Sequence, residues 1–169
     1  GRTMKRMLVL LVSILVISSV AMADHIGVYG DENGQSCNLG APGLTTTPTI
    51  IHTTTSGATG SRFKVTLPAG STFLGFNTPF PEIGDLPGDQ SLGYGGCYTG
   101  NIVLGTITAV VTAGGVEVLP ADNFASIIYT DCSFGELNAT GGKGYVGSGD
   151  CLALAVEPST WGRVKSLYR

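Results

Sequence analysis

The amino-acid sequence predicts an all-β protein, folded as a single β-sandwich of about nine strands. Glycine is too abundant for a helical protein, at 26 of 169 residues, and it shows no collagen-like period. Several short segments alternate apolar and polar residues, which gives a strand one buried face and one exposed face. Turn residues separate these segments at intervals of about 8 to 12 residues, a spacing typical of sandwiches and barrels.

The clearest predicted strand is RFKVTL, residues 62–67, in which three apolar side chains alternate with three polar ones. The turn residues Pro68, Ala69 and Gly70 follow, and TFLGF then resumes an apolar pattern. We therefore expect these two strands to pair as a hairpin or meander. The other predicted strands are Ile26–Tyr29, Thr49–Thr55, Asn101–Val111, Val116–Leu119, Ser126–Thr130, Gly144–Gly147 and Leu152–Val156.

Two longer segments need separate arguments. Asn101–Val111 is apolar on both faces apart from two threonines, which indicates a strand in the middle of a sheet. Its β-branched residues and the TAGG turn that follows favour a strand over a buried helix. Phe80–Gly96 is rich in proline and glycine and carries three acidic residues, so we expect a long surface loop there.

The first 23 residues have the parts of a secretory signal peptide. Two basic residues precede a 13-residue apolar run, Leu8–Val20, and the sequence AMA at 21–23 matches the A-x-A pattern of a cleavage site. The run is shorter than the roughly 20 residues of a membrane-spanning helix, so no membrane span is expected after leader cleavage. An uncleaved N-terminal anchor is the alternative.

Cleavage would leave one β-sandwich domain, residues 24–157, followed by a C-terminal tail, residues 158–169. The leader takes away three of the nine basic residues and none of the 12 acidic ones, which changes the net charge from -3 to -6. A chain with this acidic balance is not expected to bind nucleic acid.

Four cysteines, Cys37, Cys97, Cys132 and Cys151, remain in the mature chain, and an oxidising compartment favours their pairing. The pairs Cys97–Cys132 and Cys37–Cys151 are favoured because each would tie strand-like segments together. The sequential pairs, Cys37–Cys97 and Cys132–Cys151, stay open. No C-x-x-C spacing occurs and neither histidine completes a zinc site, so no metal site is assigned.

No catalytic residue is assigned. His25 lies beside the cleavage site and His52 in strand-like sequence, and no G-x-S-x-G motif is present, which favours a structural role for both histidines. A secreted hydrolase is the alternative function, and it would need two carboxyl groups that face each other in a cleft. Calcium binding by loop carboxylates lacks an EF-hand sequence, and no cofactor is expected. The candidate carboxylates are Asp31, Glu32, Asp85, Asp89, Asp131 and Asp150.

The tail holds the only tryptophan of the chain and three basic residues. Its pattern predicts a short amphipathic helix, with Trp161 and Tyr168 on an apolar stripe and with Arg163 and Lys165 on the other face. About ten residues are too few for a stable isolated helix, so the stripe needs a surface to cover it. The tail either docks on the domain's own sheet or acts as a recognition element for a partner, an export apparatus or the anionic cell surface.

Several segments carry a resemblance: the leader, ADHIGVYGDENGQSC, GATGSRFKVTLPAGSTFL, ATGGKGYVGSGDC and the closing EPSTWGRVKSLYR. Together they resemble a group of uncharacterised exported bacterial proteins with a Cys-bearing β-domain and a T-W-G-x-I/V-K-x-L-Y ending. This resemblance covers most of the mature chain and implies export and a β fold, but no substrate. The strand pattern is also similar, in architecture only, to cohesin-like and immunoglobulin-like sandwiches of extracellular modules.

These observations favour an exported, non-catalytic surface or extracellular matrix component. We expect it to make protein or glycan contacts at the cell surface, and not to be an enzyme. The expected location is secreted, at the cell surface or in the periplasm.

We predict cleavage after Ala23, because the A-x-A site directly follows the apolar run. N-terminal sequencing of the secreted protein should therefore begin at Asp24. Mature protein that keeps residues 1–23 and stays in the membrane fraction would contradict export by this route.

Overall fold

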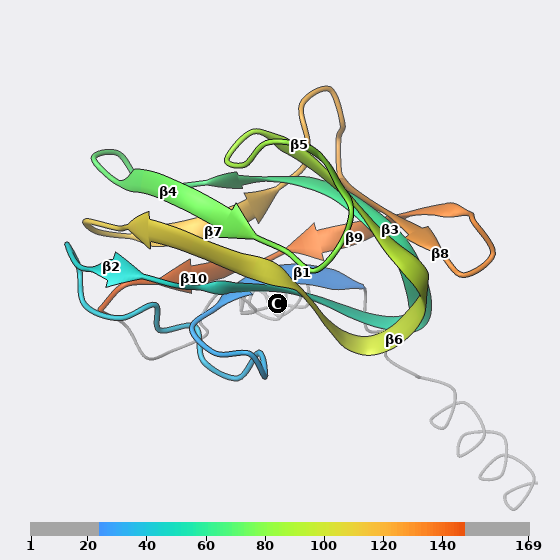
Figure 1. The fold of residues 1–169 in the computed structure, drawn as a ribbon, viewed down its shortest axis with the longest axis horizontal. Helices are drawn as coiled ribbons and strands as arrows, with labels where there is room; N and C mark the ends of the chain where they lie inside the picture. Colours follow the sequence, from blue (N-terminus) through green and yellow to red (C-terminus); the bar gives the residue numbers. More distant parts are fainter. Residues whose placement is uncertain (1–23, 148–169) are drawn as a thin grey trace, which may run out of the picture.

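The computed structural model describes residues 24–147, and this part of the chain is all β (Figure 1). No helix long and apolar enough to cross a membrane occurs in the described part. Ten strands are present there, two of them much longer than the rest. They are β1 His25–Tyr29, β2 Thr45–Thr46, β3 Thr49–Thr66, β4 Thr72–Asn77, β5 Glu82–Gly84, β6 Asp89–Val110, β7 Gly115–Leu119, β8 Ile127–Asp131, β9 Glu136–Gly141 and β10 Lys143–Tyr145.

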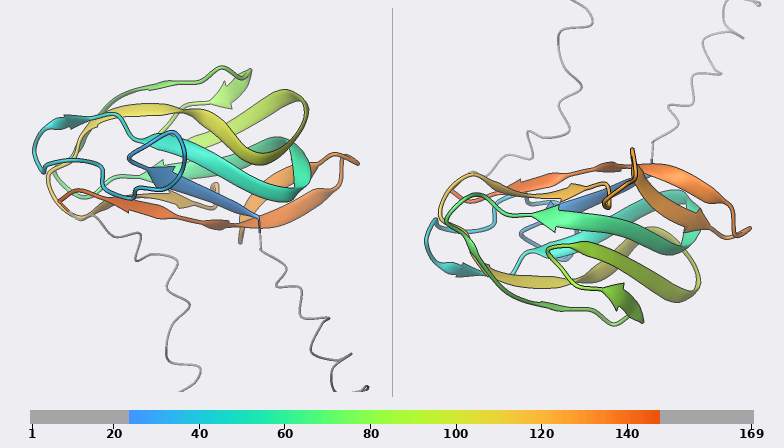
Figure 2. Two further views of the ribbon diagram at one scale, coloured as in Figure 1. Left: turned by 90° about the horizontal axis from the view of Figure 1, so that it is seen from below. Right: turned by 90° about the horizontal axis from the view of Figure 1, so that it is seen from above.

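The long strands β3 and β6 pair along most of their length and pass through both layers of the fold (Figure 2). Residues 49–54 of β3 lie between β1 and residues 100–106 of β6. Further along, residues 60–64 of β3 pair with residues 89–93 of β6, and the other edge of β3 binds β8 and β7. The register shifts where β3 passes from one layer to the other, because the strands bend there.

The remaining strands complete the two layers. In one layer β5 pairs with the first half of β6, so the order there is β5-β6-β3-β8. In the other layer β4 and β2 pair with the second half of β6, while β1 pairs with β3 and also, in parallel, with β9. Because β9 pairs with β8, the ladder β3-β8-β9-β1-β3 closes on itself.

Alternating side chains of these strands fill the space between the layers. Phe63 and Val65 of β3 are fully buried and lie in the same cluster as Leu104 and Ile107 of β6. Full burial of such an aliphatic or aromatic side chain contributes about 1.5–3 kcal/mol. The same cluster contains Val116 from β7, and its other large members are Ile26, Val28, Leu39, Ile50, Leu86, Leu92, Tyr94, Ile102, Val111, Val118, Ile127 and Tyr129.

The prediction of a surface loop over Phe80–Gly96 is wrong. Residues 82–84 form β5, and β6 begins at Asp89, so its first eight residues fall inside the expected loop. Gln90, Leu92 and Tyr94 alternate inward and are buried. The glycines that suggested a loop have a local purpose at the β5–β6 turn, where Gly84 has φ +109° and an added Cβ would lie 1.9 Å from the Asp89 carbonyl oxygen.

The expected hairpin between residues 62–67 and the following strand is also wrong. β4 instead pairs with β6, placing Phe73 opposite Ala109 and Phe76 opposite Ile107. RFKVTL joins the predicted strand Thr49–Thr55 in the single 18-residue strand β3. The central position expected for Asn101–Val111 is confirmed, because this half of β6 pairs with β3 on one edge and β4 on the other.

The shorter predicted strands fare better. Those at 26–29, 116–119 and 126–130 are present as β1, β7 and β8, and the one at 144–147 is replaced by the shorter β10. The leader, the strand expected at 152–156 and the helix expected in 158–169 lie outside the described residues.

We predict that Leu92→Ala lowers the free energy of unfolding by about 2–5 kcal/mol, because it removes a buried side chain of the core. Denaturant unfolding followed by circular dichroism measures this loss. The matched control is Leu74→Ala on β4, where the side chain is 57% exposed, and the expected change is within about 0.5 kcal/mol. Equal effects of the two substitutions would contradict a buried Leu92 and would support a surface loop over residues 80–96.

Candidate functional site

The outer face of the β5-β6-β3-β8 layer carries one continuous row of side chains across five strands. Ile83 of β5 lies opposite Ser91 of β6, which in turn lies opposite Arg62 of β3. Arg62 faces Ile128 of β8, and Ile128 faces Asn138 of β9. The row therefore places an isoleucine on either side of the Ser91–Arg62 pair.

Small residues make this face concave. Gly60 and Gly93 are register partners next to the row, and an added Cβ at Gly60 would lie 2.8 Å from the carbonyl oxygen of Leu92. The resulting hollow has a volume of about 300 Å³. We call it the outer hollow, and it is lined by Thr59, Gly60, Ser61, Arg62, Ser91, Leu92, Gly93, Phe124, Ile128, Thr130 and Glu136.

Charged groups at the edge of the outer hollow hold one another in place. The Arg62 guanidinium donates to Asp89 at 3.1 Å and lies 4.6 Å from the centroid of the Phe124 ring. The backbone N–H of Asp122 donates to the other Asp89 oxygen at 2.6 Å, and this bond, together with Arg62, lowers the pKa of Asp89. Lys64 pairs with Asp122 at 2.7 Å, so the two bases of this face are both neutralised by neighbours.

A second group of polar side chains lies buried between the layers and centres on His52. Its Nδ1 lies 3.0 Å from the Tyr94 hydroxyl, which donates to Ser61 Oγ at 2.7 Å. The Tyr129 ring packs edge-on at 5.1 Å between centroids. In the described part of the chain no group hydrogen-bonds His52 Nε2. Burial lowers the pKa of His52 to about 4, the Asp24 carboxylate opposes this shift, and His25 adds to it.

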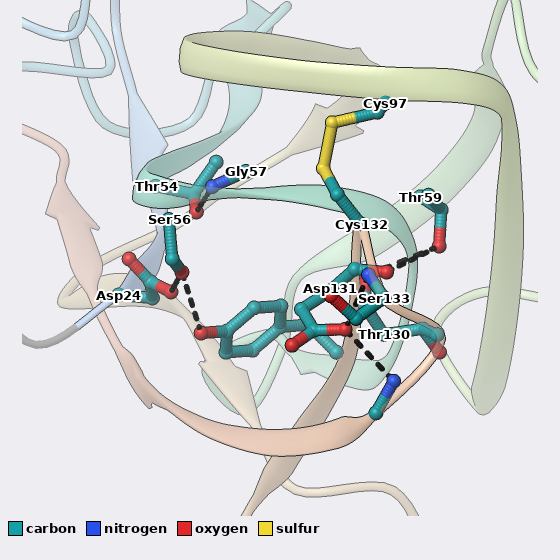
Figure 3. Close-up of a disulfide and its surroundings, with 12 residues drawn as sticks. Asp24, Thr54, Ser56, Gly57, Thr59, Cys97, Thr130, Asp131, Cys132 and Ser133 are labelled. Carbon is teal, nitrogen blue, oxygen red and sulfur yellow. Dashed lines mark hydrogen bonds between the residues drawn. A yellow bond between two sulfur atoms is a disulfide. The ribbon is translucent and has the colours of Figure 1, made fainter.

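The Asp24 carboxylate accepts hydrogen bonds from residues at the start of the bend in β3 (Figure 3). Its carboxylate accepts from the Thr55 backbone N–H at 3.0 Å and from Ser56 Oγ at 3.2 Å. Burial alone would raise the pKa of Asp24, but hydrogen bonds from Tyr129, Thr55 and Ser56 outweigh it and lower the pKa. The arrangement is structural, because the carboxylate is fully engaged in holding strand ends together.

The polar group therefore lacks the parts of a hydrolase. His52 reaches Ser61 only through Tyr94, and His52, Tyr94 and Ser61 are all buried. His25 contacts Thr140 Oγ1 at 3.0 Å through Nδ1 and is buried too. A nucleophile must lie next to its base and be open to substrate, and this cluster meets neither condition.

Cys97 of β6 and Cys132, just after β8, form a disulfide with a Cα–Cα distance of 5.3 Å (Figure 3). This is the pair favoured from sequence, and it rules out Cys37–Cys97. Gly57 makes room for it, since an added Cβ would lie 2.5 Å from Cys132 Sγ. No cysteine among residues 24–147 is free. Cys37 is buried near Tyr29 and Ile51, and its expected partner Cys151 lies outside the described residues, so that second pair stays a prediction.

Two of the loop carboxylates singled out in the sequence serve local turns. Asp31 accepts backbone N–H groups of Asn33, Gln35 and Ser36, and Asp131 accepts those of Ser133 and Gly135. Among the described residues, no three His, Cys, Asp or Glu side chains gather as a metal site would need. Asp150 and the tail residues Trp161, Arg163, Lys165 and Tyr168 lie outside the described range.

Sequence reasoning missed the outer hollow because it assigned three of the residues that line it, Ser91, Leu92 and Gly93, to a loop. A usable signal was present in SLGY, where Leu92 and Tyr94 alternate with Ser91 and Gly93. Period-two alternation indicates a strand even when glycines follow it.

Comparison with known proteins finds similar folds among solved structures. No protein-family model matches the chain, and no curated protein matches it. Among solved structures, a chain in the CaDoc0917–CaCohA2 complex aligns with 73% of this chain and 97% of its own length, at 12% identity and a TM-score of 0.50. A cohesin module from a family 33 glycoside hydrolase of Clostridium perfringens aligns with 73% of this chain and 96% of its own, at 4% identity and a TM-score of 0.50.

The likeness is one of fold. It confirms, at that level, the cohesin-like sandwich inferred from the strand pattern. The resemblance to exported bacterial proteins with the T-W-G-x-I/V-K-x-L-Y ending stays a prediction.

We predict that the protein loses stability as the pH falls from 7 to 5. The folded state keeps His52 neutral down to a pKa of about 4, whereas an unfolded histidine protonates near 6.5. The unfolded state therefore binds more protons in this window, and the free energy of unfolding falls by about 2 kcal/mol. Urea unfolding at several pH values measures the slope, and His52→Gln should flatten it.

A direct titration guards against a variant that fails to fold. The imidazole proton resonances of His52, followed by NMR in the wild-type protein, should not titrate above about pH 5. A midpoint near 6.5 would contradict the buried, neutral state.

Proposed function

We propose that the protein is an exported, non-catalytic module that binds a protein partner through the outer hollow and the strand row beside it. The observation that carries this proposal is the row Ile83-Ser91-Arg62-Ile128, which spans four adjacent strands in register. A face held by main-chain pairing on several strands is rigid, so a partner loses little affinity to ordering it.

The composition of the face suits a protein contact. Ile83 is 81% exposed and Ile128 half-buried, so the row offers aliphatic area beside a guanidinium that is already oriented by Asp89. Interfaces concentrate their binding energy in such apolar and arginine positions surrounded by polar groups. One of the structures of similar fold was solved as a complex of two proteins, CaDoc0917 and CaCohA2.

A glycan ligand and a hydrolase are less well supported by this geometry. Sugar rings stack on open aromatic faces, and the Arg62 guanidinium lies over one face of Phe124, the aromatic ring of the outer hollow. A glycosidase needs two carboxyl groups on either side of its substrate. Glu136 is the one carboxylate that lines the outer hollow.

The test is site-specific photo-crosslinking of the full-length protein in its native cells. We predict that benzoylphenylalanine in place of Ser91 yields one dominant protein adduct, because Ser91 lies at the centre of the face. The matched control carries the same cross-linker in place of Leu74, an exposed position on β4 in the other layer. Equal adducts from both positions, or none from Ser91, would overturn the proposal.

The affinity for the partner identified by cross-linking gives a quantitative test of the same proposal. Ile83→Asp should weaken binding at least about tenfold, since it places a charge in the apolar part of the interface. Leu74→Asp should leave the affinity unchanged. Both side chains are largely exposed in the free protein, so neither substitution is expected to unfold it.

A further inference from the structure

The hairpin between β8 and β9 presents an exposed phenylalanine in a costly backbone conformation. Phe134 is 81% exposed and has φ +63°. A bulky residue in the left-handed region is unfavourable by roughly 1–2 kcal/mol. Glycine would adopt this conformation without the cost, yet the glycine of this turn stands one position later, at Gly135. Backbone strain of this kind is common at functional sites. The Phe134 ring is largely exposed, so burial in the described domain does not offset the cost of its backbone conformation.

The loop that carries Phe134 is held rigidly. Asp131 Oδ1 accepts the backbone N–H groups of Ser133 and Gly135, both at 2.8 Å, and the Asp131 carbonyl accepts that of Phe134 at 3.1 Å. The disulfide at Cys132 ties the same loop to β6. The backbone that carries the ring is therefore fixed in place before any contact forms, which lowers the entropy cost of binding.

An apolar hollow of about 360 Å³ lies beside the ring. We call it the disulfide notch. Its walls are backbone of two glycines, the disulfide and the Phe134 ring, so a flat aromatic group can approach closely. The lining residues are Thr59, Gly95, Gly96, Cys97, Cys132 and Phe134.

The charges around the notch select a cationic occupant. Residues 131–136 contain Asp131 and Glu136 and no basic residue. In the described domain the basic residues are Arg62, Lys64 and Lys143, and each is already paired with a carboxylate. The same range holds ten acidic residues, so a second copy of the domain would meet an uncompensated negative surface.

We propose that the disulfide notch binds the C-terminal segment Ser159–Arg169 of the same chain, with Trp161 beside Phe134. This segment has an aromatic anchor and three basic residues, Arg163, Lys165 and Arg169, and no acid. It therefore complements an apolar notch with an acidic surround in both respects. The disulfide notch adjoins the outer hollow at Thr59. The inference does not rest on the proposed function, because its occupant is a segment of the same chain and not a partner protein.

The chain is long enough to make this contact within one molecule. Fourteen residue steps separate Gly147 from Trp161, and an extended chain of that length spans up to about 46 Å. A sphere with the radius of gyration of a domain of this size, about 14 Å, is about 36 Å across, which is less than this reach. Linkage of this kind gives an effective concentration on the order of millimolar, which favours the segment of the same chain over that of another copy.

The experiment uses the fluorescence of Trp161, the single tryptophan of the full mature chain. We predict blue-shifted emission and protection from acrylamide quenching, relative to the chain in denaturant. Phe134→Asn should move both readouts to the denatured values while the thermal midpoint stays unchanged or rises, since asparagine adopts a positive φ more readily than phenylalanine.

Three controls assign the contact. Leu74→Thr, at an exposed apolar site on β4, should leave the emission unchanged. Raising the salt concentration from about 0.05 M to about 1 M should increase the quenching, because it screens the attraction of the basic residues. The emission should not depend on protein concentration.

Three results would overturn the proposal. The first is a solvent-like Trp161 in the wild-type chain. The second is a protected Trp161 whose emission ignores Phe134→Asn, which would place the segment elsewhere. The third is protection that appears only as the protein concentration rises, which would assign the contact to another copy.

Discussion

The pairing of β3 with β6 is the constraint on which the rest of this fold depends. Both strands run through the two layers, so each layer contains about half of β3 and about half of β6. The break in their register near residues 54–60 is where the chain turns from one layer to the other. Asp24, the Cys97–Cys132 disulfide and Gly57 all gather at this bend, because a bent pair of strands leaves backbone donors and space that side chains must satisfy.

This arrangement explains which parts of the fold could be predicted from the sequence. Alternation of apolar and polar residues is local, so it located β1, β7 and β8 and the apolar half of β6. Pairing partners depend on distant residues. The expected hairpin after RFKVTL failed because β6, β7 and β8 occupy the edges of that segment, so β4 pairs with β6 instead. The polar and glycine-rich stretch TSGATGS concealed that β3 is one strand, since the bend needs small residues that otherwise signal turns.

The candidate sites differ in the same way: local sequence patterns could be predicted, and contacts between distant strands could not. The Cys97–Cys132 pair could be predicted because it ties two strand-like segments together. The outer hollow could not be foreseen, because it exists only when Ser91, Arg62 and Ile128 come into register on three strands. The buried state of His52 was equally invisible, since His52 is enclosed by Tyr94 and Tyr129 from distant strands.

The closed ladder around β1 also decides how the domain responds to a mechanical load. β1 runs antiparallel to β3 and parallel to β9, whose chain continues through β10 to Gly147 at the opposite end of the fold (Figure 1). A pull applied between residues 24 and 147 is therefore directed along the strands and loads their hydrogen bonds in shear. All five register pairs between β1 and β3 must then yield together, and they cannot open one after another as in a hairpin pulled from its free ends. A module held at both ends outside the cell would keep its shape under tension for this reason.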